Sequence, residues 1–182
     1  TADRFRIPGL VMADEVVAHM MERVTIPPAE AIPRVERKRP RQGPGENGFL
    51  PFKPDDDLIP PMVHAGEGYR IHFTGLTHDE RGYPALTAPA HDRLVRRLVD
   101  KVRLRESEIV EYEEYCPEDA RVVIIAYGST ARSARRAVGL AREQGIAAGL
   151  LRPITLWPFP GERVKKLAER VRAFVVPELN LG

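Results

Sequence analysis

The chain has 182 residues, enough for one well-buried core with connecting structure, because single domains usually run to about 100–200 residues. Lys and Arg total 28 against 26 Asp and Glu, and this net charge of +2 gives no argument for nucleic acid as a partner. The hydrophobic fraction of 43% and charged fraction of 30% are typical of a soluble globular protein, and no apolar run approaches the ~20 residues of a membrane span. We therefore expect no nucleic-acid or membrane partner, and, with no signal peptide visible, a cytoplasmic location.

Residues 1–25 have the pattern of helix, strand and helix. Thr1–Arg6 is polar and compatible with a helix, which Ile7-Pro8 would end because proline disfavours helical backbone in the residue before it. Gly9–Ala13 predicts a short strand, and Asp14 is expected to cap a helix over residues 15–23. The chain opens inside a predicted helix and stops just past a predicted strand. We therefore expect a fragment of a longer polypeptide, with residues 1–25 as the end of a preceding α/β domain.

Residues 26–68 form a proline-rich connector. Nine of the 17 prolines lie between residues 26 and 61, a density that forbids helix interiors and central strands. An acidic cluster at residues 55–57 follows a basic cluster of Arg34, Arg37, Lys38, Arg39 and Arg41. We interpret the basic cluster as a solvated linker, or as a strap on a partner's acidic surface. Contact with phosphate or nucleic acid is the weaker interpretation, because no aromatic side chains interleave with the basic ones.

Residues 69–117 contain one predicted strand and two predicted helices. Residues 69–75 alternate apolar and polar, the pattern of a half-buried strand, and a loop rich in titratable side chains follows to Pro84. Ala88-Pro89 predicts the start of a helix with one apolar stripe (Leu94, Val95, Leu98, Val99 and Val102). Its cationic residues, which include Arg97 and Lys101, are expected on a solvated face. Residues 107–115 are predicted to form a second helix.

The last third of the chain predicts a doubly wound α/β core. Apolar runs start at Val122, Ile146 and Ala173, and helical segments extend to Arg142 and begin at Glu162. Continuous apolar runs indicate strands buried on both faces, and strands that alternate with helices indicate a mostly parallel sheet.

Three patterns could carry chemistry. Gly128-Ser129-Thr130 lies between a predicted strand and helix, where free backbone N–H groups suit phosphate, although Ser or Thr there is more often a helix cap. His78-Asp79-Glu80 offers too few ligands for a closed zinc site, so we favour a hydrogen-bonded loop at an interdomain contact. Cys116 has no nearby histidine, and a single cysteine excludes an internal disulfide and a self-contained iron–sulfur cluster.

Five segments resemble the α subunits of 2-oxoacid:ferredoxin oxidoreductases, and among them the 2-oxoglutarate (KorA-type) enzymes. The most specific is the loop Leu156-Trp157-Pro158-Phe159-Pro160, preceded by the run 149–155. The other matching segments are residues 10–15, the Gly-x-x-His-Asp-Glu-x-Gly loop at 75–82, residues 127–130 (Tyr-Gly-Ser-Thr) and residues 176–182. In the last segment, residues 177–180 read Pro-Glu-Leu-Asn where the family more often has Val-Glu-Met-Asn.

The resemblance implies a fold and a reaction. Residues 69–182 would form a three-layer α/β/α domain with a mostly parallel sheet, similar to the C-terminal domain of transketolase, and residues 1–25 would close the pyrimidine-binding domain. The whole enzyme would decarboxylate a 2-oxoacid, expected to be 2-oxoglutarate, on thiamine diphosphate. It would pass the acyl group to coenzyme A and the electrons through iron–sulfur chemistry to ferredoxin.

The resemblance also places the catalytic groups outside this chain. The ligands of the diphosphate, the Mg²⁺ and the iron–sulfur cluster would belong to a β subunit, with γ and δ subunits as further possible partners. We expect no catalytic residue and no metal ligand here, and the chain alone to be inactive. The residues expected at a subunit interface or cofactor contact are His78, Asp79, Glu80, Arg81, Gly128, Ser129, Thr130, Arg152, Thr155, Glu178 and Asn180.

Two other functions stay open from the sequence alone. A stand-alone α/β module could bind a phosphorylated small molecule at Gly128–Thr130. An interaction module without a ligand could use the proline connector as its strap. Ligand binding by the isolated chain would distinguish the first of these from a subunit that needs its partners.

Overall fold

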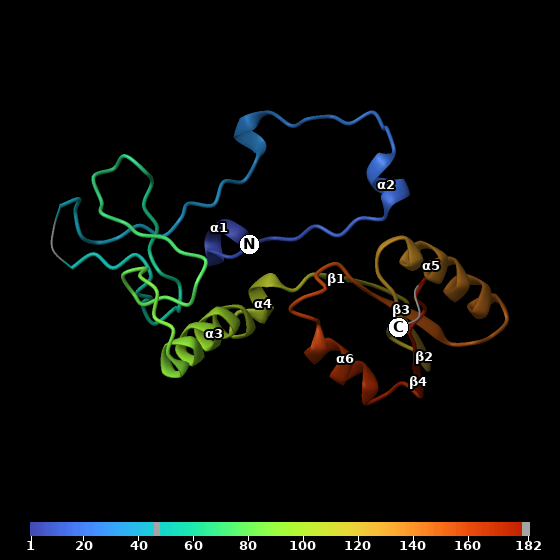
Figure 1. Cartoon of the computed structure of the whole chain (residues 1–182). Helices are drawn as coiled ribbons and strands as arrows, with labels where there is room; N and C mark the ends of the chain where they lie inside the picture. Colours follow the sequence, from blue (N-terminus) through green and yellow to red (C-terminus); the bar gives the residue numbers. More distant parts are fainter. Residues whose placement is uncertain (46–47, 180–182) are drawn as a thin grey trace. The chain divides into compact units, whose positions relative to one another are not determined.

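A computed structural model describes residues 1–45 and 48–179 (Figure 1). The chain divides into two compact units, one of Thr1–Leu10 with Arg23–Arg105, the other of Val11–Glu22 with Glu106–Gly182. We call them unit 1 and unit 2. In the described part of the chain, no helix is both long and apolar enough to cross a membrane.

Unit 2 is built on a four-stranded sheet. Its strands are β1 (Tyr112–Tyr115), β2 (Val122–Ile125), β3 (Ala148–Pro153) and β4 (Ala173–Val175), in the order β1-β3-β2-β4. β2 lies parallel to both β3 and β4, and β1 is antiparallel to β3. The mostly parallel α/β sheet predicted from the apolar runs is confirmed.

Two helices cover opposite faces of this sheet (Figure 1). On one face, α5 (Gly128–Glu143) packs apolar side chains, fully buried at Val138, against Ala148 and Leu150. On the other, α6 (Gly161–Ala168) places the fully buried Leu167 in a cluster with Ala120, Val123 and Leu151. Successive strand residues point to opposite faces, so the apolar runs supply both cores.

The helix predicted over residues 107–115 is wrong. α4 covers only Glu106–Ile109, and Tyr112–Tyr115 is strand β1. Its register pairs Tyr112 with Pro153 and Tyr115 with Leu150. Hydrogen bonds to a strand more than 30 residues away outweigh the local helical propensity of the glutamates between the tyrosines.

Residues 1–25 form two short helices and no strand. The helices are α1 (Ala2–Phe5) and α2 (Glu15–His19), and Asp14 caps α2 by accepting a hydrogen bond from Val16 N at 2.9 Å, as predicted. The strand predicted over residues 9–13 is absent among the described residues, and Leu10, Val11 and Met12 are exposed. A strand needs a neighbouring strand for its hydrogen bonds, and the structure offers none to this segment.

Among its described residues the connector has turns, bends and one 3₁₀ helix, η1 (Ala29–Ala31), but no α-helix or strand, as its prolines predicted. Within unit 1 its basic cluster pairs with carboxylates of the same chain. Lys38 Nζ lies 2.8 Å from Asp55 and 2.7 Å from Asp57, Arg37 pairs with Asp3, and Arg39 pairs with Glu67. Lys38 thus joins the basic cluster to the acidic one, while Arg37 and Arg39 pair with carboxylates outside the acidic cluster.

Two further predictions in unit 1 are wrong. Residues 69–75 form no strand, and the only pairing nearby in the described chain is a single bridge between His78 and Pro84. Helix α3 (Ala88–Arg103) starts at Ala88-Pro89 as predicted, but its cationic residues do not all face solvent. Lys101 is 1% exposed, and Arg97 is partly buried.

Candidate functional site

The carboxyl ends of β2 and β3 carry most of the predicted site residues of unit 2. Open α/β sheets place ligands and contacts at this edge, where neighbouring connections leave toward opposite faces. After β2 the chain enters α5 through Gly128, whose φ of +56° favours glycine. The residue before the helix is Tyr127, which provides no side-chain cap. The capping role expected of Ser129 or Thr130 is therefore wrong, because both lie inside the first turn.

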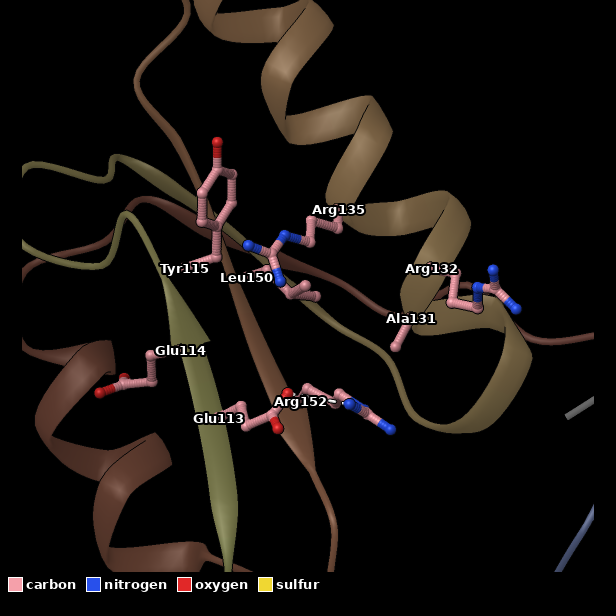
Figure 2. A pocket seen from close by; sticks show the side chains of 8 residues that line it. All are labelled: Glu113, Glu114, Tyr115, Ala131, Arg132, Arg135, Leu150 and Arg152. Atoms are coloured by element: carbon pink, nitrogen blue, oxygen red, sulfur yellow. Dashed lines mark hydrogen bonds and ion pairs between the residues drawn. The ribbon is translucent and has the colours of Figure 1, made fainter. Parts of the chain in front are cut away.

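A cavity of about 100 Å³ adjoins the first turns of α5 (Figure 2). Its lining comes from β1, β3 and α5 and includes the predicted site residue Arg152. Arg152 Nη1 donates to Glu113 at 2.8 Å, whereas its Nε is buried and has no partner among the described residues. Arg135 lies over the Tyr115 ring, 4.9 Å from its centroid, as Figure 2 also shows.

The charge around this cavity is positive. Arg132, Arg135 and Arg152 line it together with Glu113 and Glu114. Glu114 is engaged by Arg163, whose Nε donates to it at 2.8 Å, and these hydrogen bonds raise the pKa of Arg163. Glu113 is then the lining carboxylate that remains to balance the charge of three guanidinium groups. The cavity and the uncapped start of α5 therefore suit a small anion.

Thr155, the other predicted residue at this edge, has a structural task. Its hydroxyl accepts a hydrogen bond from Glu111 N and donates one to the Ile109 carbonyl, both at 3.1 Å. These bonds tie the end of β3 to the start of β1. Glu178 is exposed, and Asn180 lies outside the described residues.

In unit 1 the predicted residues 78–81 form a loop organised by Asp79. The Asp79 carboxylate accepts hydrogen bonds from the backbone of Arg81 and Tyr83, and from the Arg81 guanidinium at 2.7 and 2.9 Å. The bonds from the Arg81 side chain hold the pKa of the Asp79 carboxyl below its ordinary value. Asp79 and Arg81 therefore neutralise each other and shape the loop, while Glu80 is exposed.

Gly82 closes this loop against His72. His72 Nδ1 donates to the Gly82 carbonyl at 2.7 Å, and the His72 ring stacks on Tyr83 with centroids 4.4 Å apart. Gly82 has a φ of +91°, and a Cβ there would lie 2.0 Å from the His72 carbonyl oxygen. Only glycine fits this position.

His78 has one nitrogen without a partner. Its Nδ1 lies 3.0 Å from the Leu76 carbonyl, which can only accept, so Nδ1 carries the proton. In neutral His78, Nε2 is then an acceptor, and this atom is buried with no hydrogen bond in the described chain. A buried polar atom left unpaired costs about 1–3 kcal/mol, so its position calls for an explanation.

The loop forms one wall of a larger cleft in unit 1, about 760 Å³ in volume. Apolar side chains of the connector, including Leu50 and Phe52, line it together with His78 and the exposed side of α3. Arg97 is the α3 cation that is both partly buried and in the lining.

The sequence did not predict the roles of the basic residues at the cavity of unit 2 and at or near the cleft of unit 1. Arg97 and Lys101 follow Leu94 by three and seven residues, a spacing that places them beside the apolar stripe and could have revealed their burial. Arg132 and Arg135 gave no such signal, because they meet Arg152 only when α5 packs against β3. No group of three or more potential metal ligands occurs among the described residues.

Comparison with known proteins assigns the family. The model described as pyruvate flavodoxin/ferredoxin oxidoreductase, thiamine diP-bdg, matches residues 1–97, more than half of the chain. The chain belongs to this oxidoreductase family. A second model, pyruvate:ferredoxin oxidoreductase core domain II, matches residues 120–182. The resemblance found in the sequence is confirmed.

Two relatives of this oxidoreductase chain match it from end to end. The 2-oxoglutarate synthase subunit KorA of Methanocaldococcus jannaschii is 45% identical over 181 residues, 100% of this chain and 47% of that protein. The corresponding subunit of Methanothermobacter thermautotrophicus is 46% identical over 182 residues, again 100% of this chain and 47% of the relative. The chain thus spans about half the length of the curated relatives it matches.

A solved structure shares the fold. The 2-oxoglutarate:ferredoxin oxidoreductase from Magnetococcus marinus, with 2-oxoglutarate, coenzyme A and succinyl-CoA bound, aligns with a TM-score of 0.74 at 26% identity. The alignment covers 85% of this chain and 27% of the other.

Proposed function

We propose that the chain is part of the α subunit of a 2-oxoglutarate:ferredoxin oxidoreductase. The observation that carries this proposal is the 45% identity, over the whole chain, to a 2-oxoglutarate synthase subunit. The reaction would convert 2-oxoglutarate and coenzyme A to succinyl-CoA and CO₂ and reduce ferredoxin. The ligands named for the Magnetococcus marinus structure agree with this substrate and product.

Thiamine diphosphate would supply the carbanion-stabilising chemistry when bound, and the protein its orientation and electrostatic surroundings. The described residues do not fit a metal or iron–sulfur site, since they contain no cluster of three potential ligands and a single cysteine. We assign no step of the reaction to this chain. We propose that the Mg²⁺ and cluster ligands belong to a β subunit, with further subunits and ferredoxin as partners. The cytoplasmic location expected from the sequence stays a prediction.

The domain layout remains part of the proposal. Residues 1–25 would close the pyrimidine-binding domain, 26–68 would be the connector and 69–182 the transketolase-like domain. The compact units divide at residues 105 and 106, and the two family models match residues 1–97 and 120–182. A boundary near residue 105 would leave the loop at 75–82 with the connector.

We assign the predicted site residues to subunit contact first. The loop around Asp79 is held rigid by its own hydrogen bonds and exposes Glu80 and Arg81, as an interface loop would. In unit 2 the start of α5, the Arg152–Glu113 pair and exposed Glu178 are the corresponding candidates. Contact with coenzyme A or substrate is the second assignment for these residues.

A second candidate function has one observation in its favour. The cavity lined by Arg132, Arg135 and Arg152 borders a helix start that no side chain caps. A stand-alone module could bind the phosphate of a small molecule there. Calorimetric titration of the chain with inorganic phosphate separates the two: the subunit proposal expects no measurable heat, and the module proposal expects binding that Arg132→Gln weakens.

The main proposal is tested with the native polypeptide that contains this chain, purified with the subunits that accompany it. We expect reduction of ferredoxin to require 2-oxoglutarate, coenzyme A and thiamine diphosphate together, and a cysteine-containing subunit to copurify. The 182-residue chain alone should show neither turnover nor thiamine diphosphate binding. Turnover of 2-oxoglutarate by the chain alone would overturn our placement of the chemistry, and a preference for pyruvate would overturn the substrate.

A further inference from the structure

Unit 1 holds three cations, one of them in the lining of the cleft, that no carboxylate of the described chain neutralises by direct contact. Arg97 lines the cleft, and Arg6 and Lys101 belong to the same unit. Lys101 is 1% exposed, and its Nζ donates to a carbonyl, that of Arg6, at 2.9 Å. None of the three forms an ion pair with another described residue.

The interactions of Arg6 place its charge against the floor of the cleft. Its Nη1 donates to the carbonyls of Pro51 and Pro61 at 2.6 and 2.9 Å. Its guanidinium lies over the ring of Phe52, 4.8 Å from the centroid, and Phe52 itself lines the cleft. Burial, and then repulsion by Arg97, lower the pKa of Arg6, so these cations disfavour one another. An anion in the cleft would relieve this repulsion.

Other charges in the lining are already balanced or solvated. Asp79 pairs with Arg81, and Asp92 pairs with Arg96 at 2.8 Å. Glu80 and Asp100 are exposed. Of the lining arginines without an ion pair, Arg97 is partly buried and Arg93 is exposed, so a bound anion would find its least hydrated partner in Arg97.

The second feature of the cleft is an acceptor without a donor. His78 lines the cleft, its ring packs against Phe52 with centroids 4.3 Å apart, and its buried Nε2 has no hydrogen bond. A ligand with an O–H or N–H group would satisfy this nitrogen. The volume of about 760 Å³ lies in the range of sites for small organic molecules, and inorganic phosphate alone would fill little of it.

We propose that this cleft binds an organic anion whose carboxylate or phosphate group pairs with Arg97, whose apolar body lies on Phe52 and whose hydroxyl or amino group donates to His78 Nε2. This inference does not rest on the proposed function. It concerns a cleft within unit 1 and would hold whatever the substrate of the enzyme.

Binding to the full chain is measured by calorimetry with five probes: 1-naphthyl phosphate, 1-naphthoate, 5-hydroxy-1-naphthoate, neutral 1-naphthol and inorganic phosphate. We expect the aromatic anions to bind at least tenfold more tightly than 1-naphthol or inorganic phosphate. The tighter of the first two identifies the acidic group as phosphate or carboxylate. Absence of binding by all aromatic anions at 10 mM, or equal binding of 1-naphthol, would overturn the proposal.

Variants locate the site. Arg97→Gln should weaken binding of the aromatic anions about tenfold or more, and Arg97→Lys should weaken it less. Arg103→Gln removes the same charge from the exposed end of α3 and should leave affinity unchanged. Equal losses in Arg97→Gln and Arg103→Gln would show binding by net charge alone and reject the site. Circular dichroism of each variant confirms that it is folded, and Arg97→Lys provides the test if Arg97→Gln is not.

The proposed hydrogen bond to His78 is tested by comparing a probe that has a hydroxyl group with one that lacks it. We expect wild-type protein to bind 5-hydroxy-1-naphthoate several-fold more tightly than 1-naphthoate, because its hydroxyl can donate to Nε2. Equal or weaker binding of the hydroxylated probe would contradict the role proposed for His78. His78→Phe should abolish this preference while keeping affinity for 1-naphthoate. A preference that survives in His78→Phe would remove His78 from the site.

Discussion

At the scale of single residues, the loop over residues 75–84 depends on the backbone of Gly82. Its φ is +91°, and a Cβ would lie 2.0 Å from the His72 carbonyl oxygen. Gly82→Ala should therefore lower the free energy of unfolding by about 1–3 kcal/mol, the usual cost of such backbone strain. Gly75→Ala is the matched control, because its φ is not positive and no atom lies within 4 Å of the added Cβ. Urea unfolding measures both, and equal stabilities would contradict the role of Gly82.

Lys101 should give the stability of unit 1 a dependence on alkaline pH. Burial first, and then the charges of Arg97 and Arg6, lower the pKa of Lys101 from 10.5 to about 8. Between these values the unfolded chain binds more protons than the folded one, so the free energy of unfolding should rise as pH increases from about 8 to 10.5. Below about pH 8 both states are protonated and Lys101 adds no slope.

Lys101→Met should remove this rise, because methionine carries no proton. Denaturant midpoints at several pH values measure it, and Lys166→Met, at an exposed position, is the control that should retain the wild-type profile. Identical pH profiles for Lys101→Met and wild-type protein would show that Lys101 titrates normally.

At the scale of elements, α6 is held to the sheet by one buried side chain. Leu167 is 0% exposed and packs with Val123 and Leu151. Leu167→Ala should cost about 2–5 kcal/mol of stability, the range for removing a fully buried leucine. Leu140→Ala, at a position 41% exposed on α5, should cost much less. Calorimetry gives both values, and comparable losses would contradict the packing described for α6.

The start of α5 offers room for stabilisation. Tyr127 has the extended backbone that a helix cap requires, with φ −122° and ψ 170°, but its side chain caps nothing. Tyr127→Asp should supply a carboxylate acceptor for the free N–H groups and raise stability by about 1 kcal/mol. Tyr127→Ala separates this gain from the loss of the ring, and thermal unfolding of the two variants should differ in favour of aspartate. A Tyr127→Asp variant no more stable than Tyr127→Ala would mean that these N–H groups are already satisfied.

At the scale of the whole molecule, the interactions that stabilise the interior of unit 1 differ from those inside unit 2. Unit 2 has apolar cores on both faces of a sheet, whereas unit 1 has little regular structure apart from α3. Unit 1 combines buried apolar side chains such as Phe5, Ile59 and Val102 with ion pairs, among them Lys38–Asp57, Arg37–Asp3 and Arg39–Glu67. Raising the salt concentration from 0.05 to 0.5 M, values chosen to screen exposed charges, should weaken each such pair by a fraction of about 1 kcal/mol. Backbone hydrogen exchange should then quicken in unit 1 and not in the strands of unit 2. Equal changes in both units would contradict this difference.

The local sequence was sufficient to predict those elements whose residues form a recognisable pattern, such as an apolar run. Strands β2, β3 and β4 were predictable because the runs at residues 122–125, 146–151 and 173–176 contain only apolar or small residues. The local sequence also predicted the cap of α2 at Asp14, the start of α3 at Pro89 and the connector from its prolines. In each case, neighbours along the chain impose the conformation.

Only part of the candidate site could be predicted from the local sequence. Asp79 and Arg81 are two residues apart, so their pairing follows from local backbone geometry. Arg152 was marked by its place at a strand end. Glu113 joins it only through the pairing of β1 with β3, and Arg135 only through the packing of α5 on the sheet. His78 was marked as a titratable residue, whereas its unpaired nitrogen depends on which groups the fold brings near.

The sequence by itself determined the α/β core, the extended connector and the family, since apolar runs, prolines and short motifs act through nearest neighbours. Only the tertiary structure decided that residues 112–115 are a strand, that residues 69–75 are not, and that Lys101 is buried. A strand is stabilised by hydrogen bonds to a partner distant in sequence, and the sequence of the segment alone does not identify that partner. The burial of a charged side chain likewise depends on what packs over it, and Lys101 contacts Arg6, which lies 95 residues away in the chain.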